Sequence, residues 1–107
     1  MTDDSVFAAL SDPTRRAVFE RLADGPLAVG VIAQGLPVSR PAVSQHLKVL
    51  KAAGLVTDRP DGAHRVYQID LRGLERARAW LDSLWNTARD AVKTEVGRTD
   101  VEERERP

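Results

Sequence analysis

The chain has 107 residues, and its 16 Lys and Arg balance 16 Asp and Glu, so the formal net charge is zero. This length allows one compact domain, and sharing its core with a second chain would add stability, because so small a domain buries only about 60–70% of its unfolded surface. The absence of cysteine excludes disulfides, thiolate metal sites and thiol redox sensing. No apolar run approaches the roughly 18–20 residues that span a bilayer, and the acidic start is unlike a secretory signal. We therefore expect a soluble, cytoplasmic protein with no membrane partner.

The charge is unevenly distributed along the chain. Residues 1–38 carry a net charge of −2, residues 39–65 carry +3 and residues 66–107 carry −1. The positive middle third provides a local field that attracts phosphates. The composition thus permits nucleic-acid binding without requiring it.

The first third of the chain predicts three short helices. Residues 4–10 have the apolar spacing of a helix of about two turns. Asp12 is a good N-cap and Pro13 suits the first helical position, so a second helix is expected over residues 13–23. A third short helix is expected over residues 28–34.

The next segment predicts a strongly patterned helix that ends at Gly54. Ser39 is an N-cap candidate for this helix, which we expect to run to about Ala53. Val43, Leu47 and Leu50 form its apolar stripe, with spacings of four and three residues. The opposite side is polar and basic, with Arg40, Ser44, Gln45, Lys48 and Lys51.

The remainder predicts a hairpin followed by a long helix. Residues 55–59 and 65–69 are rich in β-formers and flank a turn-forming segment. From Leu71 to about Val96 a heptad-like stripe predicts a helix, on which Trp80 and Trp85 point to different sides. After Gly97 the chain is charged and poor in apolar residues. We therefore predict one domain over residues 1–97 and a disordered tail over residues 98–107.

The predicted fold class is mainly α with a small β-hairpin, in the order α-α-α-α-β-β-α. Two consecutive helices joined by a short Gly-containing turn and followed directly by a hairpin describe a winged helix-turn-helix.

Three stretches resemble the arsenical-repressor (ArsR) family of bacterial winged helix-turn-helix regulators: DPTRRAVFERLADGPLAVGVIAQGL, SRPAVSQHLKVLKAAGLVTDR and DGAHRVYQIDLRGL. The resemblance covers roughly residues 5 to 95. Its most specific pattern is Ser-x-x-x-Ser-x-His-Leu-x-x-Leu-x-x-x-Gly-Leu-Val. Here it stands, with one extra residue between the serines, as Ser39, Ser44, His46, Leu47, Leu50, Gly54, Leu55 and Val56. The resemblance implies a homodimer built on the first and last helices, which binds an inverted-repeat operator and represses nearby genes, its own among them.

The chain departs from the family members that sense metals. Their Cys-x-Cys pair corresponds to residues 27–31, which hold no metal ligand, and their second site needs a His that the final helix lacks. His46 and His64 lie in the reading helix and at the hairpin tip, too far apart to share a metal within one chain. Asp82 and Asp90 fit a solvated helix face better than a cation site. We therefore predict no metal and no cofactor, and leave open a small-molecule effector, a partner, or no signal.

The predicted contacts with double-stranded DNA lie on the patterned helix and the hairpin. The Gln45 amide matches adenine in the major groove, although a plain surface Gln is the alternative. Ser39 either caps the helix alone or also donates to a phosphate, and His46 either contacts DNA or packs against the hairpin. Arg15 and Arg16 are further candidates for phosphate contact. The predicted set is Ser39, Arg40, Ser44, Gln45, His46, Lys48, Lys51, Arg59 and Arg65.

The last helix carries more apolar side chains than one small domain can bury, so a dimer interface is favoured over an ordinary core helix. A dimer places two reading helices about 34 Å apart and requires a pseudo-palindromic site. The predicted dimerisation residues are Val6, Phe7, Leu10, Trp80, Leu81, Leu84, Trp85, Ala88 and Val92.

Two other functions fit the sequence less well. The sequence contains no GxSxG, P-loop, GxGxxG or HExxH pattern and no evident nucleophile–base pair, so we predict that the protein is not an enzyme. A winged-helix module used for protein–protein interaction is the alternative. The polar and basic outer face of the patterned helix argues against it.

Overall fold

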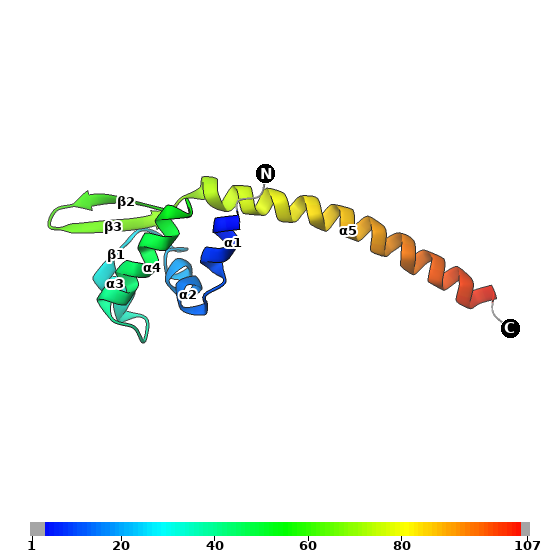
Figure 1. Cartoon of the computed structure of the whole chain (residues 1–107), viewed down its shortest axis with the longest axis horizontal. Coiled ribbons are helices and arrows are strands. Elements are labelled where there is room, and N and C mark those ends of the chain that lie inside the picture. The colour runs from blue at the N-terminus through cyan, green and yellow to red at the C-terminus, as the bar shows by residue number, and fades with distance from the viewer. Residues whose placement is uncertain (1–3, 106–107) are drawn as a thin grey trace. The chain divides into compact units, whose positions relative to one another are not determined.

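The computed structural model describes the backbone of residues 4–105 and the side chains of residues 4–94. The contacts divide the chain into two units, the first ending at Ala77 and the second starting at Arg78, and each is described by itself. The predicted helices and hairpin are all present, with one additional short strand. The elements are α1 (Asp4–Leu10), α2 (Pro13–Arg21), β1 (Leu27–Ala28), α3 (Val29–Gln34), α4 (Arg40–Ala52), β2 (Val56–Asp61), β3 (His64–Ile69) and α5 (Leu71–Glu105) (Figure 1).

The ends of α4 are fixed by specific caps. The Ser39 hydroxyl accepts the backbone N–H of Ala42 at 3.2 Å, which confirms the predicted N-cap. At the other end the N–H of Gly54 donates to Lys51 and that of Leu55 donates to Leu50, each at 3.0 Å. With φ of +78° at Gly54, this is a Schellman motif, which lets the chain leave α4 and enter β2 at once.

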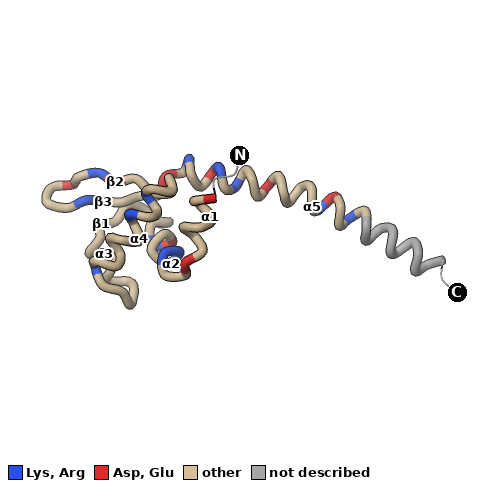
Figure 2. The backbone as a smooth tube through the Cα atoms, viewed as in Figure 1, with Lys and Arg blue, Asp and Glu red and all other residues tan. Residues whose placement is uncertain are grey.

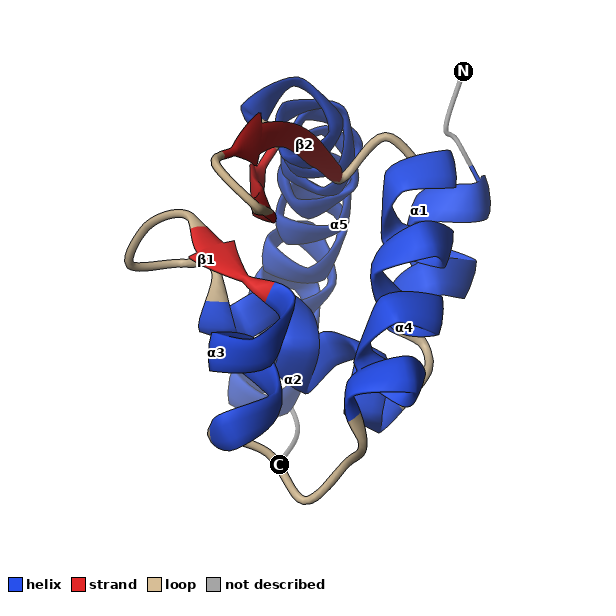
Figure 3. Cartoon of the chain, turned by 90° about the vertical axis from the view of Figure 1, so that its left-hand side faces the viewer, coloured by secondary structure: helices blue, strands red, loops and turns tan. Residues whose placement is uncertain are grey.

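The core of the first unit gathers around α4. Val43, Leu47 and Leu50 are each 0% exposed, as the stripe predicts. Figure 3 shows α2, α3 and α4 grouped together, and the contacts between these helices carry most of the packing around α4. The buried residues are Val6, Ala9, Val18, Phe19, Leu22, Ile32, Val43, Leu47, Leu50, Ala53, Leu55 and Val56.

The hairpin belongs to a three-stranded antiparallel sheet in the order β1-β3-β2. The sequence did not predict β1, because two residues are too few to show alternation and they become a strand through pairing with Val66 and Tyr67. The predicted tip of five residues shortens to Gly62 and Ala63, since β2 extends to Asp61 and β3 begins at His64. Gly62 has φ of +63°, as the first position of a tight hairpin turn requires.

The last helix is longer than predicted. α5 continues to Glu105, so the expected end near Val96 is wrong. Glu and Arg are good helix formers, and Gly97 costs a helix only about 1 kcal/mol relative to Ala. Side chains from residue 95 onward and the backbone of residues 106 and 107 lie outside the described residues, so the separate tail over 98–107 stays a prediction. No helix in the described part of the chain is long and apolar enough to cross a membrane.

Candidate nucleic-acid interface

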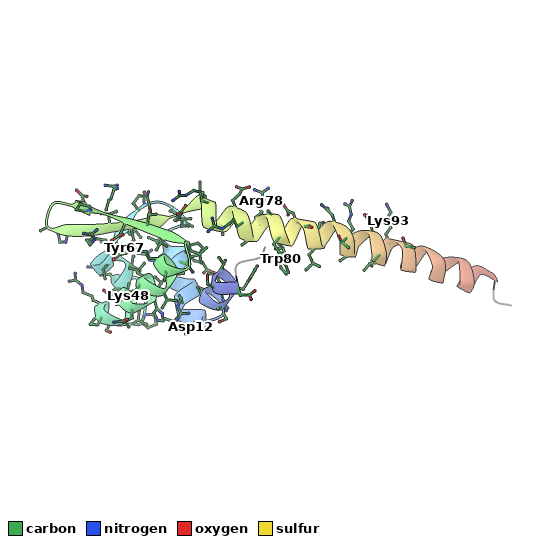
Figure 4. The ribbon with its side chains drawn as sticks, turned by 45° about the horizontal axis from the view of Figure 1, so that its top comes forward. Asp12, Lys48, Tyr67, Arg78, Trp80 and Lys93 are labelled. Atoms are coloured by element: carbon green, nitrogen blue, oxygen red, sulfur yellow. The ribbon has the colours of Figure 1, made fainter. Side chains whose placement is uncertain are left out.

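The outer face of α4 is polar and is held on a fixed base. Because successive helical residues turn by about 100°, the burial of Leu47 and its stripe directs Ser44, Gln45 and Lys48 away from the core. All three are exposed. Figure 4 labels Lys48 on α4 and Tyr67 on the neighbouring hairpin. Three side chains of different reach thus lie together on one rigid helical surface.

A cleft of about 460 Å³ lies between the start of α4, the start of α3 and the hairpin. Its polar lining includes Arg40, Ser44, His64 and Arg65, which come from α4 and β3. Arg40 lies against Gly30, where an added Cβ would lie 3.3 Å from the guanidinium carbon. The cleft therefore joins predicted contacts from the helix and from the hairpin into one surface.

The two arginines of the hairpin lie on opposite faces of the sheet. Asp58 pairs with Tyr67 and Pro60 pairs with Arg65, so these residues share the face on which Val56 is buried. Arg59 pairs with Val66 and lies on the other face. Arg65 therefore lines the cleft, whereas Arg59 is exposed on the far side.

Asp58 links α4 to the hairpin through both of its carboxylate oxygens. Lys51 Nζ lies 2.7 Å from Oδ1, and Arg65 donates from Nε to Oδ2 at 2.7 Å. The Asp58 side chain is only 8% exposed. The hydrogen bonds from Lys51 and Arg65 hold the pKa of Asp58 below its ordinary value of 3.8, and the Asp58 carboxylate raises the pKa of Arg65. Lys51, which the sequence assigns to phosphate, is thus paired with Asp58, although 55% of its side chain stays exposed.

Three other residues that were candidates for DNA contact interact within their own protomer. Arg15 donates to the carbonyl of Ala9 and Arg16 to the carbonyl of Leu10, so both hold the corner between α1 and α2. The hydrogen bond from the Arg15 backbone N–H is the main reason that the pKa of Asp12, the N-cap of α2, lies below 3.8, and the neighbouring His46 also lowers it. His46 is half-buried, and it lies close enough to Asp12, the N-cap of α2, to lower the pKa of that carboxyl. We therefore leave these three residues out of the interface.

Lys and Arg occur on α4 and on both strands of the hairpin, as the blue segments of Figure 2 show. The +3 charge of residues 39–65 therefore lies on two neighbouring elements of one unit. Among the described residues no group of three or more His, Cys, Asp or Glu side chains is placed to hold a metal ion. On α5, Asp82 lies 3.7 Å from Arg78, an exposed pairing that fits a solvated helix face.

The second unit presents an apolar face of α5. Leu84 is 47% exposed and Trp85 is 63% exposed, and every residue from Arg78 to Thr94 is exposed. Trp80 and Trp85 lie about 140° apart around the helix, so they flank the stripe that runs through Leu81, Leu84, Ala88 and Val92. Trp85, Ala88 and Val92, with Arg89 and Lys93, also line a shallow hollow of about 410 Å³.

The predicted dimerisation residues of α1 differ from one another in burial. Phe7 is 38% exposed and Leu10 is partly buried, so both offer surface to a partner. Val6 is 1% exposed and packs in the core of its own chain. The helix period explains this, because one side of so short a helix must close the core, and we leave Val6 out of the interface.

Asp58 is the residue that sequence reasoning missed. In the sequence it only subtracts one charge from a basic segment. The signal that would have found it is Gly62 followed by Ala63, because a Gly at the first position suits a two-residue hairpin turn and so fixes the register of the hairpin. That register makes Asp58 and Arg65 diagonal neighbours on one face.

Comparison with known proteins agrees with this geometry. A family model described as a helix-turn-helix domain matches residues 10–59. The chain is 64% identical over 85 residues to the HTH-type transcriptional regulator Rv2034 of Mycobacterium tuberculosis, covering 79% of each chain. It is 35% identical over 78 residues to the transcriptional repressor SdpR of Bacillus subtilis, covering 73% of this chain and 87% of that one. These relatives are regulators, and the chain is not an enzyme.

Two solved structures share the fold. The crystal structure of a possible transcriptional regulator for arsenical resistance has a TM-score of 0.71 at 41% identity, over 85% of this chain and 95% of that one. The homodimeric winged helix-turn-helix DNA-binding domain Mb0332 of Mycobacterium bovis, a possible ArsR-family regulator, has a TM-score of 0.64 at 27% identity, over 82% of each chain. The chain belongs to the ArsR family of winged helix-turn-helix transcriptional regulators.

Proposed function

We propose that this regulator is a homodimeric repressor that binds an inverted-repeat operator, near its own gene among others, in the bacterial cytoplasm. In each protomer α4 enters the major groove and the hairpin contacts the flanking backbone. The observation that carries this proposal is the outer face of α4, where Ser44, Gln45 and Lys48 are exposed on a helix whose opposite side is fully buried.

The roles follow from reach and charge. The Gln45 amide has the donor and acceptor that pair with adenine in the major groove. We assign Lys48 and Arg40 to phosphate contacts. Ser39 and Ser44 lie near the start of the helix, where hydroxyls commonly donate to phosphate. On the hairpin, we assign Arg65, which lines the cleft, and Arg59, which lies on the far face, to contacts with the backbone or the minor groove.

The exposed stripe of α5 supports a homodimer. Large apolar side chains gathered on one exposed helical face mark a protein contact, because water solvates such a surface poorly. Leu81, Leu84, Trp85, Ala88 and Val92 supply this face, with Trp80 on its edge. In the first unit, the exposed surface of Phe7 and Leu10 on α1 is a separate candidate for contact with a partner. A two-fold dimer also presents the +3 segment twice to one DNA duplex, so the DNA meets a positive surface although each chain has a net charge of zero.

We also propose that repression is not controlled by a metal. The chain has no Cys, and its two His residues lie on the inner side of α4 and at the hairpin tip. Adding Zn²⁺ alone should leave the affinity for the operator unchanged. A change of tenfold or more, about 1.4 kcal/mol, would contradict this part of the proposal.

The test of DNA reading starts from a duplex selected out of a random library by the purified protein. The wild type should bind this operator about 10³-fold or more tightly than a random duplex. Gln45→Ala should lower operator affinity by about 1–3 kcal/mol and leave random binding unchanged, as measured by fluorescence anisotropy. The matched control is Gln68→Ala, an exposed glutamine near the base of the hairpin, which should change neither.

Two results would contradict the proposal. Selection that yields no preferred sequence would favour the alternative, a winged-helix module that binds another protein. Equal losses on operator and random duplexes for Gln45→Ala would show that Gln45 does not read bases.

A further inference from the structure

Asp58 is a carboxylate within the most basic part of the proposed DNA-binding surface. A free carboxylate there would repel phosphates and weaken binding. The Asp58 side chain is only 8% exposed, however, and both of its oxygens are bound, one by Lys51 and one by Arg65. The negative charge of Asp58 is therefore neutralised by two cations of the same surface, one from α4 and one from β3.

These contacts join α4 to the hairpin beyond the buried base of the hairpin at Val56. Lys51 lies in the last turn of α4, and Arg65 lies near the tip of the hairpin. β1 pairs only with Val66 and Tyr67, so from Arg65 to the turn the sheet has two strands. A two-stranded ribbon is marginally stable by itself, and the position of its tip relative to α4 needs a further contact.

We propose that Asp58 is a positioning residue for operator recognition, a proposal that rests on the DNA-binding function proposed above. The Lys51–Asp58–Arg65 contacts, here called the wing brace, set the position of the hairpin relative to the reading helix. Arg65 has five N–H donors and the brace uses the one on Nε, so the same guanidinium binds Asp58 and contacts a phosphate. Phosphate contacts fix the register from which bases are read, so the brace sets how well α4 discriminates between sequences.

Asp58→Asn has two opposite effects under this proposal. The loss of a negative charge strengthens binding to every duplex, because fewer charges oppose the phosphates. The loss of the brace lowers the preference for the operator. The quantity to measure is therefore the ratio of operator affinity to random-duplex affinity, and a change in total charge alone does not move this ratio.

The experiment compares the wild type, Asp58→Asn and Asp61→Asn on the selected operator and on a random duplex, by anisotropy over a range of salt concentrations. Asp61 is the matched control, since it lies on the same hairpin, is exposed, and makes no ion pair among the described side chains. Asp58→Asn should bind the random duplex more tightly and lose about tenfold in the ratio, the size of one charge-assisted hydrogen bond. Asp61→Asn should strengthen both bindings and keep the ratio.

A second variant breaks the brace from the other side with the opposite change in charge. Lys51→Gln should weaken binding to the random duplex and still lower the operator-to-random ratio. The double variant Asp58→Asn with Lys51→Gln should lose no more of the ratio than either single variant, because the three side chains act as one unit.

An unchanged ratio in Asp58→Asn and Lys51→Gln, with operator preference intact in the wild type, would overturn the wing brace and leave the proposed function standing. Additive losses in the double variant would also overturn it. A wild type with no preferred sequence would overturn the proposed function, and the brace with it.

Discussion

The outer face of α4 and the apolar face of α5 are both exposed, but for different physical reasons. On α4, Gln45 and Lys48 are polar and lie on a helix whose inner side is fully buried. On α5, Leu84 and Trp85 are large and apolar, yet they are 47% and 63% exposed. Water forms hydrogen bonds with the polar side chains of α4, whereas it solvates the apolar side chains of α5 poorly. The comparison separates a surface suited to a charged, hydrated ligand from one suited to another protein chain.

The largest effect is expected from a charge on the apolar face of α5. Both protomers of a two-fold dimer carry the substitution Leu84→Glu, so two carboxylates would be buried without partners. The protein should become a monomer by sedimentation, and operator affinity should fall by about 10²–10⁴-fold because the two reading helices are no longer linked. Asn86→Glu lies on the polar side of the same helix and should remain a dimer. A dimeric Leu84→Glu would show that this face is not the interface.

A second large effect is expected from the buried side of α4. Leu47 is 0% exposed, so Leu47→Ala should lower the free energy of unfolding by about 2–5 kcal/mol, through lost burial and the cavity left behind. Urea denaturation measures this change. Val49→Ala, at a residue of the same helix that is 40% exposed, should cost well under half as much. Similar losses in the two variants would contradict the assignment of the inner and outer faces.

A smaller effect is expected from the outer side of α4. Lys48→Ala should weaken operator and random duplexes alike and reduce the slope of log affinity against log salt by about one per protomer, as the loss of one phosphate contact requires. Lys93→Ala on α5 removes the same charge outside the proposed reading surface and should leave the slope unchanged. If Lys48→Ala also kept the wild-type slope, Lys48 would not contact phosphate.

The smallest effect concerns pH. The pKa of Asp58 is lowered in the fold, so its ion pairs stabilise the protein above the ordinary value of 3.8 and lose their effect as the pH falls through the lowered pKa. Wild type should therefore be more stable than Asp58→Asn at neutral pH, and the difference should shrink in acid below 3.8. Thermal unfolding at a series of pH values measures this difference. A difference that stays constant with pH would show that the carboxylate charge does not matter.

The sequence predicts the elements that depend on local patterns. The stripe of Val43, Leu47 and Leu50 gives the orientation of α4, because helical periodicity alone decides which side is buried. The hydroxyl of Ser39 gives its starting point, since Ser is a preferred N-cap.

The features that the sequence does not predict depend on contacts between distant segments. β1 exists only through pairing with β3, and the binding of Lys51 by Asp58 requires the register of the hairpin and its position beside α4. His46 has the same spacing whether it faces DNA or α2, so its half-buried position emerges only from packing. Local periodicity does not determine these contacts between distant segments.

The decisive measurement is the affinity of the protein for its selected operator with 5 or 10 base pairs inserted between the half-sites, roughly half a turn and a full turn of DNA. If two α4 helices from one dimer bind the two half-sites together, the half-turn insertion rotates one half-site out of reach. With the half-turn insertion, the affinity should then fall to that of a duplex with one half-site. With the full-turn insertion, the affinity should fall less. An affinity that the half-turn insertion leaves unchanged would contradict reading by a dimer of winged helix-turn-helix protomers.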